Sequence, residues 1–303
     1  MLLQTQVILL QFLFLILGLE SASTGGLALP GCSDKCGNIS IPYPFGIGRG
    51  CYLGDAYAVE CHAPNLLLLW ESRVSVLNLT LEGYIRLALN VSYKCRDLKS
   101  NNSESSEPSY SFTRFAISPT SNKLTGVGCG GFVTMMDMDN MQNQFSCATM
   151  TNQSHGMIDG KCNGYDCCQL PISGNISRFL IQTTIPSNPD CAPWPISCHY
   201  AFLVEDEGYE FRSSDLLVLR ESRERPVLFN CLMLISFMDI LFIFSMVFIF
   251  FNFLRKCNNI LTPGYLCNCT EGYQGNPYLK NGCQGTCHPF IIFLVYSLNS
   301  LST

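Results

Sequence analysis

The chain has 303 residues, of which 18 are cysteines and only 14% are charged, and its formal net charge is −5. This length allows one large domain or two small ones. The cysteine content indicates an oxidising compartment, because the spacings lack the paired Cys-x-x-Cys units of metal sites. The negative charge argues against nucleic acid as a partner, since phosphate binding needs a basic surface.

Residues 1–23 are predicted to form a signal peptide. Residues 7–19 are almost wholly apolar, and the small residues at 21–23 suit cleavage. No Lys or Arg precedes the apolar run, which leaves a signal anchor as the alternative, although the run is short for a membrane span. We therefore expect the chain to enter the secretory pathway.

Residues 32–51, CSDKCGNISIPYPFGIGRGC, place three cysteines around a stiff segment. Pro42 and Pro44 fix their own φ and favour extended geometry in the residues before them. The glycines that follow allow positive φ or a close backbone approach. Tyr43 and Phe45 are therefore expected on a segment that cannot become helical.

Residues 32–226 are predicted to form one mainly β, disulfide-rich extracellular domain. An even count of cysteines permits six bridges, and the pairing stays open. Cys167 and Cys168 are expected to bond to other partners, because a disulfide needs well-separated Cα atoms. The twelve candidates are Cys32, Cys36, Cys51, Cys61, Cys95, Cys129, Cys147, Cys162, Cys167, Cys168, Cys191 and Cys198.

Two stretches of alternating residues predict a β-hairpin. Apolar residues at 85, 87, 89, 91 and 93 alternate with mostly polar ones, leucines at 77, 79 and 81 do the same, and residues 82–83 suit a turn. Two glycosylation sequons fall on the polar faces of these strands. Seven sequons support secretion, and they begin at Asn38, Asn78, Asn90, Asn101, Asn152, Asn175 and Asn268.

Residues 99–111 are polar and are predicted to form a loop. This loop separates two parts of unlike charge. Residues 32–99 contain seven Lys/Arg and six Asp/Glu, whereas residues 100–226 contain eight and fourteen. An anionic ligand is therefore expected to meet less repulsion on the first part.

Residues 232–254 are predicted to form a transmembrane helix, about 34 Å long. Sixteen are Leu, Ile, Phe or Val, which favours insertion by roughly 5–10 kcal/mol. Asp239 opposes insertion by about 2.5–3.5 kcal/mol, so insertion prevails. We expect a single-pass plasma-membrane protein with an extracellular N-terminal domain, or a cell-wall protein if this run does not insert.

Residues 257–287 resemble the C-terminal half of an EGF-like module, in which cysteines surround a Gly-aromatic-x-Gly turn. Such modules need oxidation, which conflicts with a cytosolic position after one membrane span. One hypothesis is that residues from about 227 to 260, and again from about 285, are foreign, as a retained intron would produce. Cys269 and Cys283 are further disulfide candidates, and residues 288–303 form an apolar tail of unknown role.

The motif at residues 32–51, with its CGN-I-x-IPYPFGIG core, resembles the N-terminal galacturonan-binding domain of plant wall-associated receptor kinases. Four later pieces are similar to the same family: VSYKC, NKLTGVGC, GKCNGYDCCQ and CHYAFLVEDEGYEF. The resemblance implies non-catalytic binding of pectic polysaccharide at the cell surface. Because no Gly-rich loop with a strand lysine, HRD or DFG occurs, we expect no kinase activity and interpret the chain as a truncated receptor-like protein.

Galacturonan carries a carboxylate on each sugar, so its receptor is expected to offer cations and aromatic ring faces. Ca²⁺ is an alternative bridge to the carboxylates, but the sequence lacks an EF-hand loop and we assign no cofactor or metal site. Tyr43 and Phe45 can equally well be buried core residues that do not contact a sugar. The binding candidates are Tyr43, Phe45, Arg49, Tyr52 and Arg86.

Two other functions are consistent with the sequence. The cysteine-rich domain can instead be a protein-interaction module that binds a peptide or a related receptor ectodomain. The chain can also be a non-functional truncated product, because the EGF-like half lacks its first three cysteines.

Overall fold

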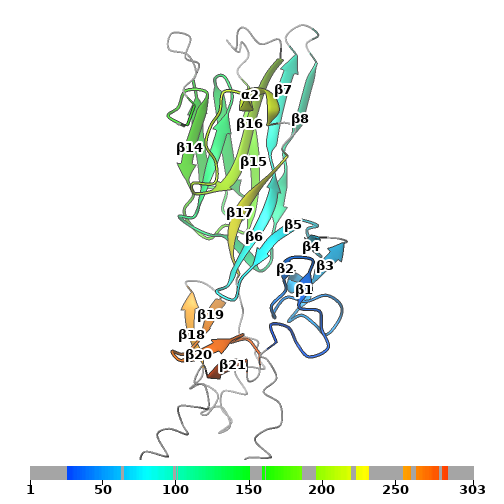
Figure 1. Cartoon of the computed structure of the whole chain (residues 1–303). Coiled ribbons are helices and arrows are strands. Elements are labelled where there is room, and N and C mark those ends of the chain that lie inside the picture. Colours follow the sequence, from blue (N-terminus) through cyan, green and yellow to red (C-terminus); the bar gives the residue numbers. More distant parts are fainter. Residues whose placement is uncertain are drawn as a thin grey trace, which may run out of the picture.

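The computed structural model describes residues 26–62, 65–97, 100, 102–150, 159–160, 162–185, 196–219, 223–231, 255–260, 264–279 and 282–285. Within these ranges the chain is mainly β, as predicted. Figure 1 shows an elongated molecule, with a long β-sandwich at one end and short C-terminal strands at the other. The N-terminal strands lie between them.

Three expectations fall outside the described residues: the signal peptide, the membrane helix at 232–254 and the apolar tail. Among the residues that the structure does describe, no helix combines the length and apolar character needed to cross a bilayer.

An antiparallel six-stranded sheet occupies the middle of the molecule, in the order β10-β17-β6-β5-β4-β3. Its strands are β3 (Val59–His62), β4 (Leu66–Leu69), β5 (Ser75–Leu79), β6 (Tyr84–Asn90), β10 (Phe115–Ile117) and β17 (Glu224–Cys231). A 3-10 turn, η1 (Asp55–Tyr57), precedes β3, and a small hairpin of β1 (Lys35–Cys36) and β2 (Ile39–Ser40) lies nearby.

The predicted hairpin is confirmed as β5 and β6, joined by a turn in which Gly83 has a φ of +81°. The expected alternation is wrong at Leu77, which is exposed, whereas Val76 is buried. The register shifts between Val76 and Asn78. This bulge inserts one residue and so exchanges the faces on either side of it.

Two further antiparallel sheets form the sandwich, with the orders β14-β11-β16-β7-β8 and β13-β12-β15-β9. The first contains β7 (Ser92–Asp97), β8 (Ser103–Ser106), β11 (Asn122–Val127), β14 (Cys167–Pro171) and β16 (Ile196–Glu205). The second contains β9 (Ser109–Ser111), β12 (Gly131–Asp137), β13 (Gln144–Thr149) and β15 (Arg178–Thr184).

The prediction of a loop at residues 99–111 is wrong, because this segment contains β8 and β9. Both are outermost strands. An edge strand needs hydrogen bonds on one side only and keeps polar side chains in water, which protects the edge from aggregation. An edge strand can therefore be as rich in polar residues as a loop.

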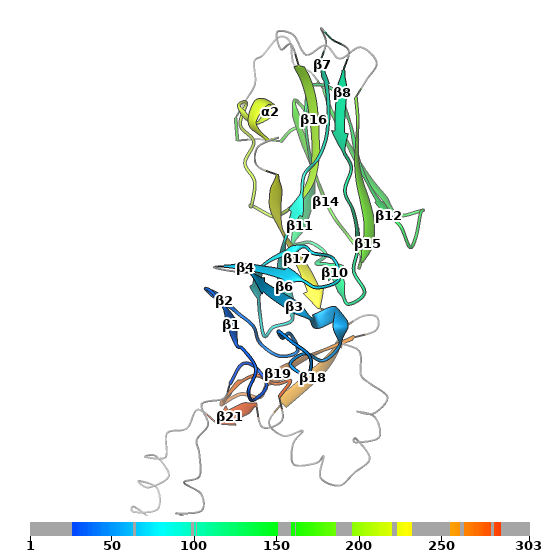
Figure 2. The ribbon, with the colours of Figure 1, turned by 90° about the vertical axis from the view of Figure 1, so that its right-hand side faces the viewer.

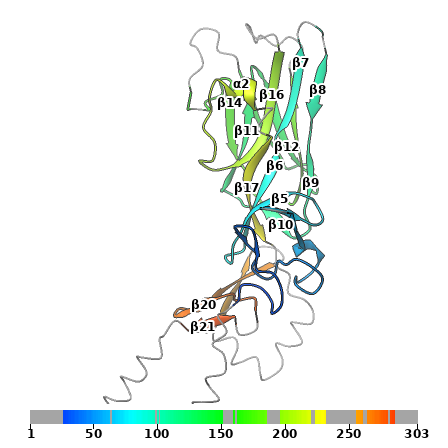
Figure 3. The ribbon, with the colours of Figure 1, turned by 45° about the vertical axis from the view of Figure 1, so that its right-hand side comes forward.

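The main core fills the sandwich and continues into the six-stranded sheet. Leu124 and Leu203 of one sheet share it with Val133 and Ile181 of the other. A second cluster, which includes Tyr200 and Phe202, lies on the outer face of the five-stranded sheet. Figure 2 and Figure 3 show the short helix α2 (Asp215–Val218) beside β16 on that face.

Six disulfides join cysteines whose two side chains are both described. Cys167 and Cys168 bond to different partners, and Cys95–Cys198 joins β7 to β16. Cys191 lies outside the described residues, and Cys129 is buried. The six pairs are Cys32–Cys51, Cys36–Cys61, Cys95–Cys198, Cys147–Cys168, Cys162–Cys167 and Cys269–Cys283.

The boundary that we expected at residue 226 falls inside β17. Residues 227–230, which the foreign-segment hypothesis included, pair with β6, and Cys231 pairs with Phe115 of β10. Val227, Phe229 and Cys231 are buried. This half of β17 therefore belongs to the core of the first domain. Sequence patterns do not mark this boundary, because residues 227–229 and 231 are apolar like most of residues 232–254.

The C-terminal part consists of two short hairpins. They are formed by β18 (Arg255–Ile260) with β19 (Gly264–Cys269), and by β20 (Tyr273–Gly275) with β21 (Cys283–Gly285). Cys267 is disulfide-bonded, and the strand register sets it opposite Cys257.

Candidate carbohydrate-binding surface

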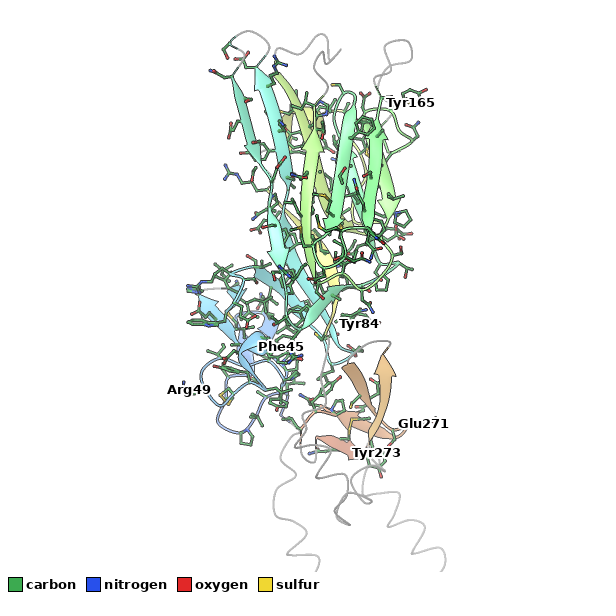
Figure 4. All side chains as sticks on the ribbon, turned by 180° about the vertical axis from the view of Figure 1, so that it is seen from behind. Phe45, Arg49, Tyr84, Tyr165, Glu271 and Tyr273 are labelled. Carbon is green, nitrogen blue, oxygen red and sulfur yellow. A yellow bond between two sulfur atoms is a disulfide. The ribbon has the colours of Figure 1, made fainter. Side chains whose placement is uncertain are left out.

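Phe45 is a core residue, so its candidacy as a sugar-binding platform is wrong. Its side chain is 1% exposed. The ring stacks on Phe115 with centroids 6.0 Å apart and meets Tyr57 edge-on at 5.5 Å. Neighbouring rings therefore cover the faces that a sugar would need, and Figure 4 shows Phe45 between the N-terminal loops and the sheet.

Tyr43 supports a contact between distant parts of the chain. Its carbonyl oxygen accepts a 2.8 Å hydrogen bond from the side-chain amide of Asn276, which also donates to the carbonyl of Leu27 at 2.8 Å. Asn276 is completely buried. The C-terminal hairpins therefore close over this side of the Tyr43–Pro44 segment.

The sequence around Asn276 explains how its amide is presented. Asn-Pro-Tyr-Leu forms a tight turn in which the N–H of Leu279 donates to the carbonyl of Asn276. Asn at the first position and Pro at the second suit such a turn. The Asn276 side-chain oxygen accepts from the Tyr278 N–H at 2.9 Å, which leaves the amide hydrogens for Leu27 and Tyr43.

Arg49 and Tyr52 lie on the loop closed by the Cys32–Cys51 disulfide. Arg49 is exposed between two glycines with positive φ, and Figure 4 shows it at the outer edge of the N-terminal loops, away from Phe45. Tyr52 is half-buried and packs against the main core. These two candidates do not converge with the others on one site.

Arg86 is exposed on β6, as expected, but its guanidinium already has a carboxylate partner. It donates to both oxygens of Glu205 on β16. This hydrogen-bonded pair raises the pKa of Arg86. Arg86 therefore links two sheets, and a ligand carboxylate would have to displace Glu205.

The turn between β4 and β5 presents an exposed aromatic ring beside a cation. Trp70 is 54% exposed, and the Arg73 guanidinium lies over its ring at 5.6 Å from the centroid. Arg73 has a φ of +57°, which is uncommon for a residue with a side chain. The hydrogen bond from its N–H to the Leu69 carbonyl, 2.9 Å, closes the turn in this conformation.

Arg73 also forms an ion pair with Glu60 of the neighbouring strand β3, and its side chain is still 60% exposed. An exposed pair of this kind contributes little to stability, because water screens it. A carboxylate from a ligand can therefore compete for the same guanidinium at small cost. Trp70 and Arg73 together match the cation and ring face that an acidic sugar needs.

A groove of about 370 Å³ begins at this turn and runs between the six-stranded sheet and β9. Its walls are residues 72–75, Ala88, Asn90, residues 108–111 and Glu224. Hydroxyl groups dominate the lining, and the volume lies in the usual range for a ligand site. We call this surface the Arg73 groove.

The charged side chains that line the Arg73 groove are Arg73 and Glu224. Tyr110 contributes a phenol, whose oxygen accepts a 2.7 Å hydrogen bond from the Asn90 N–H. Burial raises the pKa of the Tyr110 hydroxyl to about 12, against the opposing effect of that hydrogen bond. Tyr110 therefore stays protonated at physiological pH and can donate a hydrogen bond to a ligand.

Sequence reasoning missed this groove for two reasons. Trp70 directly follows four leucines, and the polar Glu-Ser-Arg stretch after it was the one available signal of a surface turn. The opposite wall comes from residues 108–111, which we expected in a loop. Within the described residues, no three His, Cys, Asp or Glu side chains form a metal-binding group.

Comparisons with known proteins identify the first part of the chain. Residues 32–89 match the family model "Wall-associated receptor kinase galacturonan-binding". The chain is 34% identical to wall-associated receptor kinase 1 of Arabidopsis thaliana and 31% identical to wall-associated receptor kinase 5 of the same plant. Each alignment covers 84% of this chain and 34% of the relative.

Wall-associated receptor kinase 4 of Arabidopsis thaliana is 28% identical, over 86% of this chain and 35% of the relative. The chain thus spans about a third of the length of these curated relatives. No solved structure matches it. Residues 32–89 therefore match the galacturonan-binding domain of the wall-associated receptor kinase family, and the chain is a homologue of the ectodomain portion of those receptors.

Proposed function

We propose that this chain is a non-catalytic receptor for de-esterified pectic galacturonan, acting outside the cell at the plant cell wall or cell surface. The ligand lies across the Arg73 groove. One galacturonate carboxylate pairs with the Arg73 guanidinium, and a neighbouring sugar ring stacks on Trp70. Groove hydroxyls, including Ser75 and Ser109, bond the sugar hydroxyls.

The observation that carries this proposal is the pairing of Trp70 with Arg73 at the rim of the groove. Both residues belong to the segment that matches the galacturonan-binding family model. Aromatic faces and bidentate guanidinium groups are the usual means of holding a carboxylated sugar. The disulfides support a position in the secretory pathway or outside the cell, where thiols are oxidised.

The test is a binding titration with the full-length protein secreted from plant cells. Its ligands are de-esterified oligogalacturonides, fully methyl-esterified ones and a neutral glucan. We expect saturable binding to the de-esterified ligand, weakened by added salt because the contact is an exposed charge pair. Equal binding of all three, or none, would exclude the proposal.

Parallel titrations with Ca²⁺ and with a chelator separate two modes of recognition. Direct pairing with Arg73 predicts binding that persists in chelator. Binding that requires Ca²⁺ would instead indicate that a calcium ion, and not Arg73, holds the ligand carboxylates. A secreted, oxidised protein that binds a receptor ectodomain but no pectin would instead support the protein-interaction function.

A further inference from the structure

We propose that Asn90 carries an N-linked glycan that covers the Arg73 groove and limits its access to polysaccharide. This proposal rests on the proposed function for its effect on affinity. Asn90 begins the sequon Asn-Val-Ser and is exposed at the end of β6. It is also one of the residues that line the groove.

The position of Asn90 in the fold directs an attached glycan toward the groove. Its N–H donates to the Tyr110 hydroxyl, and its side chain also bonds to that group. On the neighbouring strand, Asn90 lies directly opposite Glu224, another groove residue. A sugar on the Asn90 amide nitrogen therefore begins between Tyr110 and Glu224.

The rest of the sequon is built into the sandwich, which fixes this position. Ser92 is completely buried, and its hydroxyl donates to the Ser106 carbonyl at 3.1 Å. The sequon must therefore be modified before this strand folds. The attached glycan would then meet the serine hydroxyls of Ser109 and Ser111, which can bond its sugars as well as those of pectin.

The modification is an ordinary group transfer from a lipid-linked oligosaccharide in the secretory pathway. The bond between the first sugar carbon and the lipid pyrophosphate breaks, and a bond from that carbon to the Asn90 amide nitrogen forms. One amide proton passes to a base, and the lipid pyrophosphate is released. Neither an oxidant nor a reductant is required.

Asn78 supplies a matched control. It begins the sequon Asn-Leu-Thr on β5, in the same sheet, and is exposed. It is absent from the lining of the groove. A glycan on Asn78 adds similar mass and hydration without blocking Arg73.

The experiment compares the full-length secreted protein with three variants: Asn90→Gln, Ser92→Ala and Asn78→Gln. Both of the first two remove the Asn90 sequon, but only one of them changes the Asn90 side chain. Mass spectrometry first measures glycan occupancy at Asn90. We expect occupancy in the parent protein and an oligogalacturonide Kd at least fivefold lower in both sequon variants, with Asn78→Gln unchanged.

Hydroxyl-radical labelling gives a second readout that does not depend on pectin. We expect the peptide that contains Pro108 and Tyr110 to label more strongly in Asn90→Gln and Ser92→Ala than in the parent. An unoccupied Asn90, or equal labelling and equal Kd in all variants, would overturn the proposal. Increased labelling with no galacturonan binding by any form would refute the proposed function and keep the glycan cover.

Discussion

The side-chain amide of Asn276 donates a hydrogen bond to the carbonyl oxygen of Tyr43, 233 residues earlier in the chain. The same amide bonds to Leu27, whose carbonyl also accepts from the Tyr43 N–H at 2.8 Å. One buried side chain thus joins the proline-rich segment of the first domain to the C-terminal hairpins.

We expect Asn276→Ala to release this contact, at a cost of about 1–3 kcal/mol, because the carbonyl groups of Leu27 and Tyr43 each lose one hydrogen bond. Amide exchange at Tyr43 is the measurement, because its N–H lies inside the affected cluster. Gln274→Ala is the matched control, since Gln274 is exposed in the same segment. Unchanged exchange at Tyr43 in Asn276→Ala would show that the contact is not structural.

Arg73→Gln should weaken oligogalacturonide binding by about tenfold, since a charged hydrogen bond contributes about 1.5 kcal/mol. It should also reduce the salt dependence of Kd. Arg73→Lys should recover part of the affinity, because lysine keeps the positive charge but cannot form two parallel hydrogen bonds to a carboxylate. Arg49→Gln is the control, and a loss as large as that of Arg73→Gln would move the site to the Cys32–Cys51 loop.

Glu224→Gln should strengthen binding by about two- to fivefold, because it removes a carboxylate that repels the ligand across the groove. The same titration at low and moderate salt measures the change. The gain should shrink as salt is added. A weaker affinity for the Glu224→Gln protein would mean that Glu224 accepts a hydrogen bond from the ligand.

The raised pKa of Tyr110 leads us to expect that the free energy of unfolding decreases at alkaline pH. Its pKa is raised to about 12 in the folded protein, from an ordinary value of 10.0. Below pH 10 the phenol is protonated in both states, so the stabilisation is complete. Between about pH 10 and 12 only the unfolded state loses the proton, and stability falls by roughly 2–3 kcal/mol.

Denaturant unfolding at pH 9 and pH 11 measures this fall, and Tyr110→Phe is the comparison. The variant should lose less stability between the two pH values than the parent, although it is less stable at pH 9. An identical decrease in both proteins would assign the alkaline loss to other groups. One such group is the Cys231 thiol, whose pKa is raised by complete burial.

Phe45→Ala should destabilise the protein by about 3–5 kcal/mol, as expected when a packed aromatic side chain is removed from a core. Thermal unfolding measures the loss. Phe45→Leu should cost less, because it fills part of the space between Tyr57 and Phe115. Unchanged stability together with weakened pectin binding would instead show that Phe45 contacts the ligand.

Local patterns in the sequence predicted the β class, the β5–β6 hairpin and the separate partners of Cys167 and Cys168. Each depends on neighbouring residues or on the geometry of a single bond. Such patterns fail at Leu77. A single-residue bulge there exposes a side chain that strict alternation predicts to be buried. A bulge depends on the partner strand, which local sequence does not contain.

The candidate site needed tertiary information for the same reason. Arg86 was correctly placed on the polar face of its strand, but Glu205, 119 residues later, already binds it. The Arg73 groove combines the turn after β4 with Ser109 and Glu224, which come from separate parts of the chain. Only the fold brings these walls together.

The passage of the chain from β6 to β7 has a mechanical consequence. These strands are separated only by Val91, yet β6 belongs to the middle sheet and β7 to the sandwich. A pull between the two ends of the molecule therefore travels along one continuous backbone. Before Val91 this backbone is hydrogen-bonded to β17, and after Val91 it is hydrogen-bonded to β16. Separating the strands by such a pull would require both sets of hydrogen bonds to break together. Tension applied along the molecule would therefore pass through the middle sheet and the sandwich together.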